Sequence, residues 1–285
     1  MTEHGRRLFL LGRGKLGTAL HSVFKERGWQ ITNPGRSDFD FSDFPALLAA
    51  LSSAQPDVIL NAAAMAGIDQ CESLADQAFH LNALLPRELA RFAESKGALV
   101  VHFSTEAVFS GRKRDYYTED DTPDPINIYG LSKLAGDHCV KENCGRYYIF
   151  RLPILFGSSP KSGQFLEKML AKARSGAGQL SIAADIITTP SFSCDVAEQV
   201  AQMVSEKAAF GLYHLANSGQ ASLYDLVREA CFMLGLSTEV CVASHRDFPG
   251  VGRKNNFTPL RSAKIPALRP WQAALREYLE TKEMI

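Results

Sequence analysis

Residues 8–17 read LFLLGRGKLG, and this stretch decides the fold of the chain. The apolar run Leu8–Leu11 predicts a short buried strand, and the apolar positions within Leu16–Arg27 recur at the spacing of a helix. The turn between them has the pattern GxGxxG, whose glycines allow a tight turn, close approach of a pyrophosphate and close helix–strand contact. N–H groups at the start of the helix then face the anion. The stretch predicts a dinucleotide-binding βαβ unit, and a glycine turn without a ligand is the alternative.

This turn supplies the first predicted cofactor-binding residues. They are Gly12, Arg13, Gly14, Lys15, Leu16 and Gly17. A P-loop is excluded because Leu16 stands where that motif has Ser or Thr. An NAD-specific site usually ends its second strand with an acidic residue for the ribose 2′-hydroxyl, but here the strand is followed by Arg36. Two guanidinium groups, those of Arg13 and Arg36, suit a 2′-phosphate. We therefore predict NADPH, with NADH as the alternative if both arginines are merely solvated, and Asp40 as a further ribose or adenine contact.

The rest of the chain alternates short apolar runs with helical patterns, which is typical of a doubly wound, Rossmann-type α/β sheet. The predicted strands are Leu8–Leu11, Trp29–Thr32, Asp57–Asn61, Ala98–Ser104, Tyr147–Leu152 and Leu212–Leu215. The predicted helices include Leu16–Arg27, Phe44–Ser53, Leu84–Ser95 and Ile128–Glu142. We expect an NAD(P)-binding domain over 1–150, to which elements of about 187–218 return. Residues 151–285 should form mainly a smaller C-terminal substrate-binding lobe, with an irregular basic loop at His245–Ile265.

Composition limits the classes of function. Lys plus Arg and Asp plus Glu both number 31 in 285 residues, which argues against a nucleic-acid partner. The six cysteines have no CxxC pair, so they predict reduced thiols in a cytoplasmic protein. The first apolar run is too short for a signal peptide, and no segment approaches the roughly 18 apolar residues of a membrane span.

The candidate chemistry lies in Tyr129 and Lys133 of the segment YGLSK, one helical turn apart on one face. The helix follows a proline turn, with Asn127 as its expected cap and Gly145 as its expected left-handed C-terminal residue. Tyr129 would protonate a carbonyl oxygen during hydride transfer, and the Lys133 ammonium would lower the pKa of the phenol. Thr105, or Ser104, ends a strand at the edge where ligands bind and would donate a hydrogen bond. The alternative is a surface helix with a half-buried tyrosine.

Several segments together carry a family resemblance: NAAAMAGIDQCE, STEAVFSG, PDPINIYGLSKLAGD, FRLPILFG, GLYHLANSGQASLYDLVREA and LRPWQAALREYL. The chain resembles the extended short-chain dehydrogenases/reductases, and among them the dTDP-4-dehydrorhamnose reductases. This resemblance implies an NAD(P)-dependent oxidoreductase that reduces the 4-keto group of a dTDP-linked 6-deoxy sugar, as in dTDP-rhamnose biosynthesis. The residues that it implies are the catalytic Thr105, Tyr129 and Lys133, the last two also touching the cofactor, and the cofactor contacts Gly14, Gly17, Ala62, Ala63 and Asn82. The small side chain of Ala64 also suits a close approach of the cofactor.

Departures from the family pattern fall where the sugar should bind. Glu106 and Ala107, followed by Val108, stand where relatives have Asp-Tyr-Val, and Pro153-Ile154 replaces a segment that ends in tryptophan. We predict these five residues as an altered substrate pocket. The acidic residues of a magnesium-dependent dimer have no counterpart here, so we predict no metal, while a homodimer stays compatible with the resemblance.

Two other functions stay open from the sequence. Arg151–Gly157 resembles the regulatory β subunit of methionine adenosyltransferase, which binds the nucleotide but works by binding a partner. The intact Tyr129 and Lys133 favour an enzyme instead. A sugar-nucleotide epimerase or dehydratase is the third reading, because Glu106 could act as an acid, although Ala107 could not act as its acid–base partner.

Overall fold

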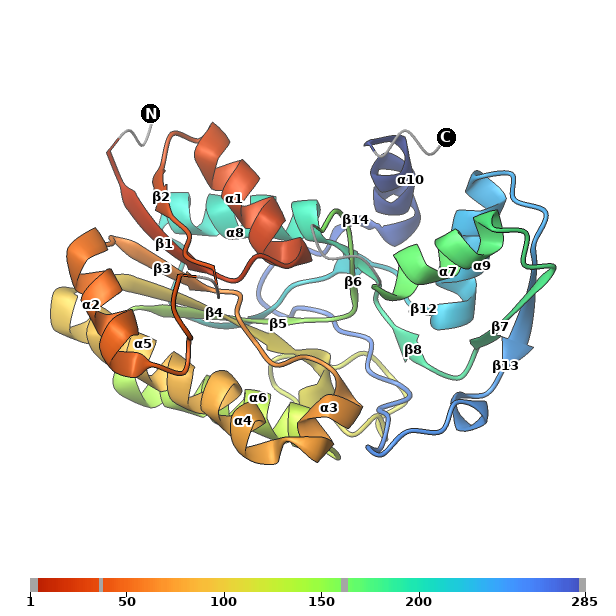
Figure 1. Cartoon of the computed structure of the whole chain (residues 1–285), viewed down its shortest axis with the longest axis horizontal. Helices are drawn as coiled ribbons and strands as arrows, with labels where there is room; N and C mark the ends of the chain where they lie inside the picture. Colours follow the sequence, from red (N-terminus) through yellow and green to blue (C-terminus); the bar gives the residue numbers. More distant parts are fainter. Residues whose placement is uncertain (1–4, 36–37, 160–163, 282–285) are drawn as a thin grey trace.

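The computed structural model describes residues 5–35, 38–159 and 164–281. Its centre is a six-stranded parallel sheet with the order β10-β5-β4-β3-β1-β2 (Figure 1). The strands of this sheet are β1 (Arg7–Leu11), β2 (Gln30–Thr32), β3 (Val58–Asn61), β4 (Leu99–Thr105), β5 (Tyr147–Leu152) and β10 (Gly211–His214). The predicted doubly wound α/β fold is confirmed, and each predicted strand agrees with the observed one to within a residue at either end.

Helices cover both faces of this sheet, which explains the apolar character of its strands. The helices are α1 (Lys15–Glu26), α2 (Phe44–Ala54), α3 (Ile68–Ser73), α4 (Ala75–Phe79), the π-helical turn η1 (His80–Leu84), α5 (Leu85–Lys96), α6 (Ile128–Asn143) and α8 (Ser193–Glu206). Figure 1 shows α1 and α8 on one side and α2, α5 and α6 on the other. Leu8 and Leu10 accordingly belong to one buried cluster, and Phe9 and Leu11 to the other.

The strand order reverses beside β1, whose neighbours are β2 and β3. At such a reversal the helices leave in opposite directions, and a crevice opens at the carboxyl ends of the strands. The glycine turn after β1 and the alanines after β3 both lie at this edge. One local expectation is wrong: Gly145 does not take up a left-handed conformation, because α6 ends in extended backbone at Cys144 and Gly145 N–H donates to Glu94 (2.9 Å).

The C-terminal part adds small sheets around a third apolar cluster, at the right of Figure 1. Its helices are α7 (Phe165–Arg174), α9 (Leu223–Met233) and α10 (Trp271–Thr281). Its strands are β6 (Leu155–Phe156), β7 (Gln179–Ala183), β8 (Ile187–Thr188), β9 (Ser191–Phe192), β11 (Asn217–Ser218), β12 (Ala221–Ser222), β13 (Glu239–Ala243) and β14 (Leu268–Pro270). Short 3₁₀ turns η2 (Glu106–Val108) and η3 (His245–Asp247) complete the elements.

Residues 193–214 return to the large sheet, since α8 packs on α1 and β10 pairs with β5. The division of the chain near residue 150 into two domains stays a prediction. Among the described residues no helix has both the length and the apolar character needed to cross a lipid bilayer.

Candidate active site

The glycine turn is packed so tightly that two of its glycines admit no side chain. A Cβ on Gly12, whose φ is +105°, would lie 2.6 Å from the carbonyl oxygen of Ala62. A Cβ on Gly17 would lie 2.2 Å from the carbonyl oxygen of Gly12. Gly14, in contrast, faces open space, with no atom within 4 Å of a Cβ built there. This is the arrangement that a pyrophosphate needs, because α1 starts next to Gly14 without a side-chain cap, so its first N–H groups are free to bind an anion.

Lys15 ties this turn to the C-terminal part of the chain. Its Nζ donates to the carbonyl oxygen of Leu155 (2.9 Å) and lies 3.4 Å from the carboxylate of Glu167 on α7. Burial lowers the pKa of Lys15, and the charge of Glu167 opposes that shift. The first turn of the cofactor helix is therefore held against β6 and α7.

Arg13, one of the two arginines predicted to select NADPH, lies beside the end of β2. Arg13 donates to the carbonyl oxygen of Asn33 just after β2, and it lies 3.6 Å from Asp38. Asp40 is exposed, and its carboxylate accepts from Ser42 N–H (2.9 Å), so it does not line the central cleft. Arg36 lies outside the described residues.

A cleft of about 630 Å³ joins the glycine turn to the predicted catalytic residues. The predicted site residues that line it are Gly14, Lys15, Leu16, Gly17, Ala62, Ala64, Thr105, Glu106, Ala107, Tyr129, Lys133, Pro153 and Ile154. They come from the ends of β1, β3, β4 and β5 and from the first turns of α1 and α6. The structure therefore brings residues far apart in the sequence together at the carboxyl edge of the sheet.

The first turn of α6 is fixed by a cap that reaches across the cleft. Asn127 caps the helix by accepting from Gly130 N–H (2.8 Å), as predicted. Its amide nitrogen donates to the carbonyl oxygen of Arg253 (2.9 Å) and to the Asn255 side chain (2.7 Å). Asn255 in turn donates to the carbonyl oxygen of Phe109, beyond β4. Hydrogen bonds thus connect the loop that contains Arg253 and Asn255 to the helix that carries Tyr129.

Tyr129 is held as a neutral phenol. A hydrogen bond joins its hydroxyl to that of Thr105, whose oxygen also accepts from Ala107 N–H (3.1 Å). Burial raises the pKa of Tyr129 to about 12, and the Thr105 hydrogen bond only partly offsets this effect. The ammonium of Lys133 is directed toward β4, where it donates to the carbonyl oxygen of Phe103. That Lys133 lowers the pKa of Tyr129 stays a prediction.

Lys133 is a buried cation, with 1% of its surface exposed. Its Nζ donates to the carbonyl oxygen of Phe103 (2.6 Å) and lies 3.3 Å from Nε2 of His102, both on β4. Burial lowers the pKa of Lys133 to about 8, although the carboxylate of Asp137 one turn along α6 opposes this shift. Lys133 is therefore able to change its protonation state near neutral pH.

Glu106 carries a proton at neutral pH. Burial raises its pKa from 4.5 to about 8, although hydrogen bonds from Thr188, Thr258 and the backbone N–H of Ile154 act in the opposite direction. The carboxyl group lines the same cleft as Tyr129. Glu106, which follows Thr105, is thus a neutral carboxylic acid, which both donates and accepts hydrogen bonds.

Six of the predicted site residues that the structure describes do not line the cleft: Gly12, Arg13, Asp40, Ala63, Asn82 and Val108. Asn82 is completely buried and braces the chain by bonding to the backbone of Met65 (2.9 and 3.0 Å) and to the Ser132 hydroxyl (3.0 Å). Val108 is buried in an apolar cluster with Phe109, and Ala63 packs against the core. The side chains of Asn82 and Val108 are thus buried in the protein, and their predicted roles in binding stay predictions.

Residues outside the predicted site also line the cleft. They include Asp69, Gln164, Phe165, Ile186, Thr188, Leu223, Asn255 and Thr258, together with Lys254 from the basic loop that the sequence indicated. Most of them follow residue 160, where the pattern of strands and helices is irregular. Thr188 and Thr258 lie more than 80 residues from Glu106 in the chain, so no local signal could have placed them beside it.

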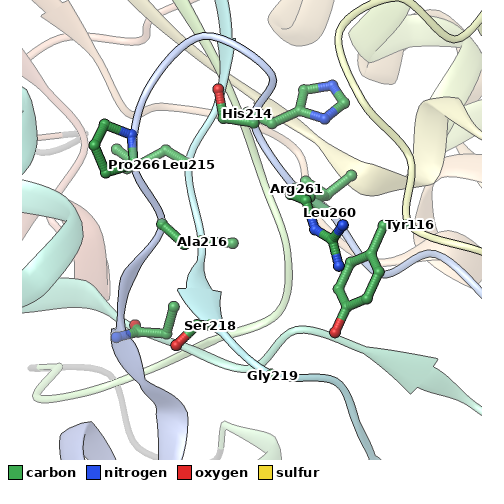
Figure 2. A pocket seen from close by; sticks show the side chains of 12 residues that line it. Tyr116, His214, Leu215, Ala216, Ser218, Gly219, Leu260, Arg261 and Pro266 are labelled. Atoms are coloured by element: carbon green, nitrogen blue, oxygen red, sulfur yellow. The ribbon is translucent and has the colours of Figure 1, made fainter.

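A separate cavity of about 100 Å³ lies between the end of β10 and residues 260–267 (Figure 2). Arg261 stacks on Tyr116 at its rim, with the guanidinium carbon 4.2 Å from the ring centre. None of the predicted catalytic or cofactor residues lines it. Its volume suits a few water molecules, so the larger cleft is the candidate active site.

Comparison with known proteins agrees with this geometry. The RmlD substrate binding domain family model matches residues 6–284. This chain belongs to that family. The family contains NAD(P)-dependent sugar-nucleotide reductases, so the predicted class of enzyme and the stated resemblance are both confirmed.

The RmlD-family chain is similar over most of its length to several characterised relatives. It is 30% identical over 273 residues to the spore coat polysaccharide biosynthesis protein SpsK of Bacillus subtilis, covering 94% of this chain and 95% of that protein. It is 31% identical over 243 residues to the dTDP-4-dehydrorhamnose reductase of Escherichia coli, covering 83% and 76%. The structure of the Clostridium acetobutylicum dTDP-4-dehydrorhamnose reductase superimposes with a TM-score of 0.91 at 28% identity, covering 97% of this chain and 99% of that one. That of the Bacillus anthracis enzyme in complex with NADP gives 0.91 at 24% identity, covering 97% and 99%.

Proposed function

We propose that this protein reduces the 4-keto group of a nucleotide-linked 6-deoxy sugar, with NADPH as the hydride donor and Tyr129 as the proton donor. The observation that supports this proposal is the single cleft that contains the open glycine turn, the Thr105–Tyr129 hydrogen bond and Lys133. A nicotinamide cofactor, when bound, supplies the hydride. The relatives named as dTDP-4-dehydrorhamnose reductases suggest a dTDP-linked sugar as the substrate, as in dTDP-rhamnose biosynthesis.

The reaction needs a proton where hydride addition leaves negative charge on the carbonyl oxygen. Tyr129 keeps its proton at neutral pH and therefore has one to give. Thr105 would donate to the same oxygen, and the charge on Lys133 would stabilise the phenolate that remains. We assign Tyr129 as the general acid, Lys133 as its electrostatic partner and Thr105 as the second hydrogen-bond donor.

The proposed cofactor preference follows from Arg13, whose guanidinium donates to the carbonyl oxygen of Asn33 just after β2, where we expect the adenosine ribose to bind. A 2′-phosphate would gain a bidentate charge-assisted contact there. Asp38, 3.6 Å from this guanidinium, would instead compete with the phosphate. NADPH should bind more tightly than NADH, with NADH still accepted.

Glu106, Ala107, Pro153 and Ile154 form the proposed sugar side of the cleft. A neutral Glu106 would donate a hydrogen bond to a sugar hydroxyl without repelling the diphosphate of the substrate. Ala107 leaves room in place of an aromatic ring. We infer a sugar pocket that selects a different ring configuration from that of dTDP-4-dehydrorhamnose, or a bulkier substituent.

The deciding experiment measures NADPH oxidation by the purified protein against a panel of nucleotide-linked 4-keto-6-deoxy sugars. We expect turnover with at least one sugar and loss of about three orders of magnitude in kcat for Tyr129→Phe, with cofactor affinity unchanged. Tyr116→Phe, outside the cleft, is the matched control. No turnover with any sugar, or full turnover by Tyr129→Phe, would refute the proposal, and formation of a new sugar without net NADPH oxidation would favour an epimerase.

A further inference from the structure

Two buried polar side chains, those of Asn61 and His102, form a hydrogen-bonded row that leads to Lys133. Asn61 ends β3 and is 1% exposed, and His102 lies on β4 and is completely buried. The Asn61 amide nitrogen is 3.2 Å from Nδ1 of His102, and Nε2 of the same ring is 3.3 Å from Nζ of Lys133. This row of side chains therefore runs from the end of β3, through the imidazole of His102, to the proposed catalytic Lys133.

The surroundings decide which ring nitrogen of His102 carries the proton. Ala63 N–H donates to the side-chain oxygen of Asn61 (3.3 Å), and this contact turns the Asn61 amide nitrogen toward the ring. Nδ1 must then accept, so the single proton of the neutral ring resides on Nε2. Asp137 favours the same tautomer, because its Oδ1 is 3.9 Å from Nε2.

This tautomer has a consequence for Lys133. A charged ammonium has only donors, so at 3.3 Å it opposes an N–H group, whereas a neutral amine could accept from Nε2–H while it still donates to Phe103. We propose that Asn61 and His102 are positioning residues whose fixed proton arrangement opposes the charge on Lys133 and lets it exchange a proton near neutral pH. The catalytic part of this inference rests on the proposed function, but the protonation part does not.

The other charged or titratable groups near Lys133 also influence whether it carries a charge. Asp137 on α6 favours the ammonium, and Arg151 on β5 shares that carboxylate through a 3.1 Å hydrogen bond. Tyr129, on the same face of α6, keeps its proton, and so does Glu106 after β4. His102 itself stays neutral, because burial and the charge of Lys133 hold its pKa well below the ordinary value. Nε2–H and burial therefore both disfavour the charged form of Lys133, whereas Asp137 favours it.

The tautomer can be measured directly. In the full-length protein labelled with ¹⁵N-histidine, we expect His102 to show a protonated Nε2 and an unprotonated Nδ1 at neutral pH. The signal is assigned by its loss in His102→Gln. The opposite tautomer, or a doubly protonated ring, would overturn the proposal whether or not the protein is a reductase.

The effect on Lys133 is measured with ¹³C-labelled lysine, by following its Cε signal against pH. His102→Gln can turn its side-chain oxygen toward the ammonium, so the titration midpoint should rise by about one pH unit. His214 is also buried but does not contact Lys133, so His214→Gln should leave the midpoint unchanged. An unchanged or lowered midpoint in His102→Gln would refute the proposal.

A second variant covers the case in which His102→Gln does not fold. Asn61→Asp offers only acceptors to Nδ1, so it should move the ring proton to Nδ1 and raise the Lys133 midpoint. If the protein reduces a ketone, the alkaline limb of kcat/KM should shift upward by the same amount as the lysine signal. If the alkaline limb of the kcat/KM profile stays in place while the lysine midpoint moves, the catalytic role proposed for this proton arrangement is refuted, but the effect on Lys133 is not.

Discussion

Glu106→Gln should stabilise the protein at neutral and alkaline pH. The carboxyl group has an ordinary pKa of 4.5 and a pKa of about 8 in the folded protein. A raised acid pKa means that the folded state binds the proton more tightly than the unfolded state does. The free energy of unfolding therefore falls as pH rises from about 4.5 to about 8, and it is constant beyond this range.

The size of the effect follows from the two pKa values. The difference between 4.5 and about 8 corresponds, at about 1.4 kcal/mol per unit, to an upper limit of about 5 kcal/mol. Glu106 lines the water-accessible cleft, and this solvation reduces the expected gain to about 2–3 kcal/mol at about pH 8. A glutamine keeps the shape and the hydrogen bonds of the neutral acid, so near pH 4.5 the variant should match the parent protein.

Urea unfolding at about pH 5 and about pH 8 measures both free energies. Glu119→Gln is the opposite control. Burial raises the pKa of Glu119, but hydrogen bonds from Ser262 and from the backbone N–H groups of Ala263 and His214 leave it below the ordinary value. That variant should lose stability, and more at pH 8 than at acidic pH. An equal stability difference at both pH values for Glu106→Gln would refute the reasoning.

Three further substitutions test the packing and charge of the site. Gly17→Ala forces a methyl group to within 2.2 Å of the Gly12 carbonyl oxygen, so NADPH affinity should fall at least tenfold and stability by about 1–3 kcal/mol, as read from fluorescence titration and thermal melting. Asp38→Asn removes the acid that competes for Arg13, so the ratio of NADPH to NADH affinity should rise severalfold, and an unchanged ratio would show that Arg13 does not contact the phosphate. Asn127→Ala removes a helix cap with buried partners, so unfolding should cost about 2 kcal/mol less and kcat should fall, and a loss of stability with unchanged kcat would separate the cap from catalysis.

The sequence predicts the sheet and the cofactor turn well because their signals are local. Strands buried on both faces appear as apolar runs, and the GxGxxG spacing between Leu11 and Thr18 is itself the shape of the turn. The Asn127 cap is predicted for the same reason, since a cap and its helix are adjacent in the chain.

The environment of the site could not be predicted in this way. The resemblance implies a cofactor contact for Asn82, but only the three-dimensional packing shows that its side chain bonds to Met65. The protonation of Glu106 depends on Thr188 and Thr258, which reach it from distant segments. The charge state of Lys133 likewise depends on what surrounds it in space. Residue identity indicates the type of chemistry, and burial sets the pH at which it operates.

The hydrogen bonds of Asn127 also restrict how this enzyme can change its substrate in evolution. The loop containing Arg253 and Asn255 borders the substrate side of the cleft, and its backbone and side chain bond to the cap of α6. An insertion in this loop would therefore disturb Tyr129, the proposed proton donor, and not only the shape of the pocket. New specificities should arise more readily at Ala107 and at Pro153–Ile154, where side chains can be exchanged without moving α6. Loop exchange between relatives should succeed when the asparagine pair is transferred with the loop.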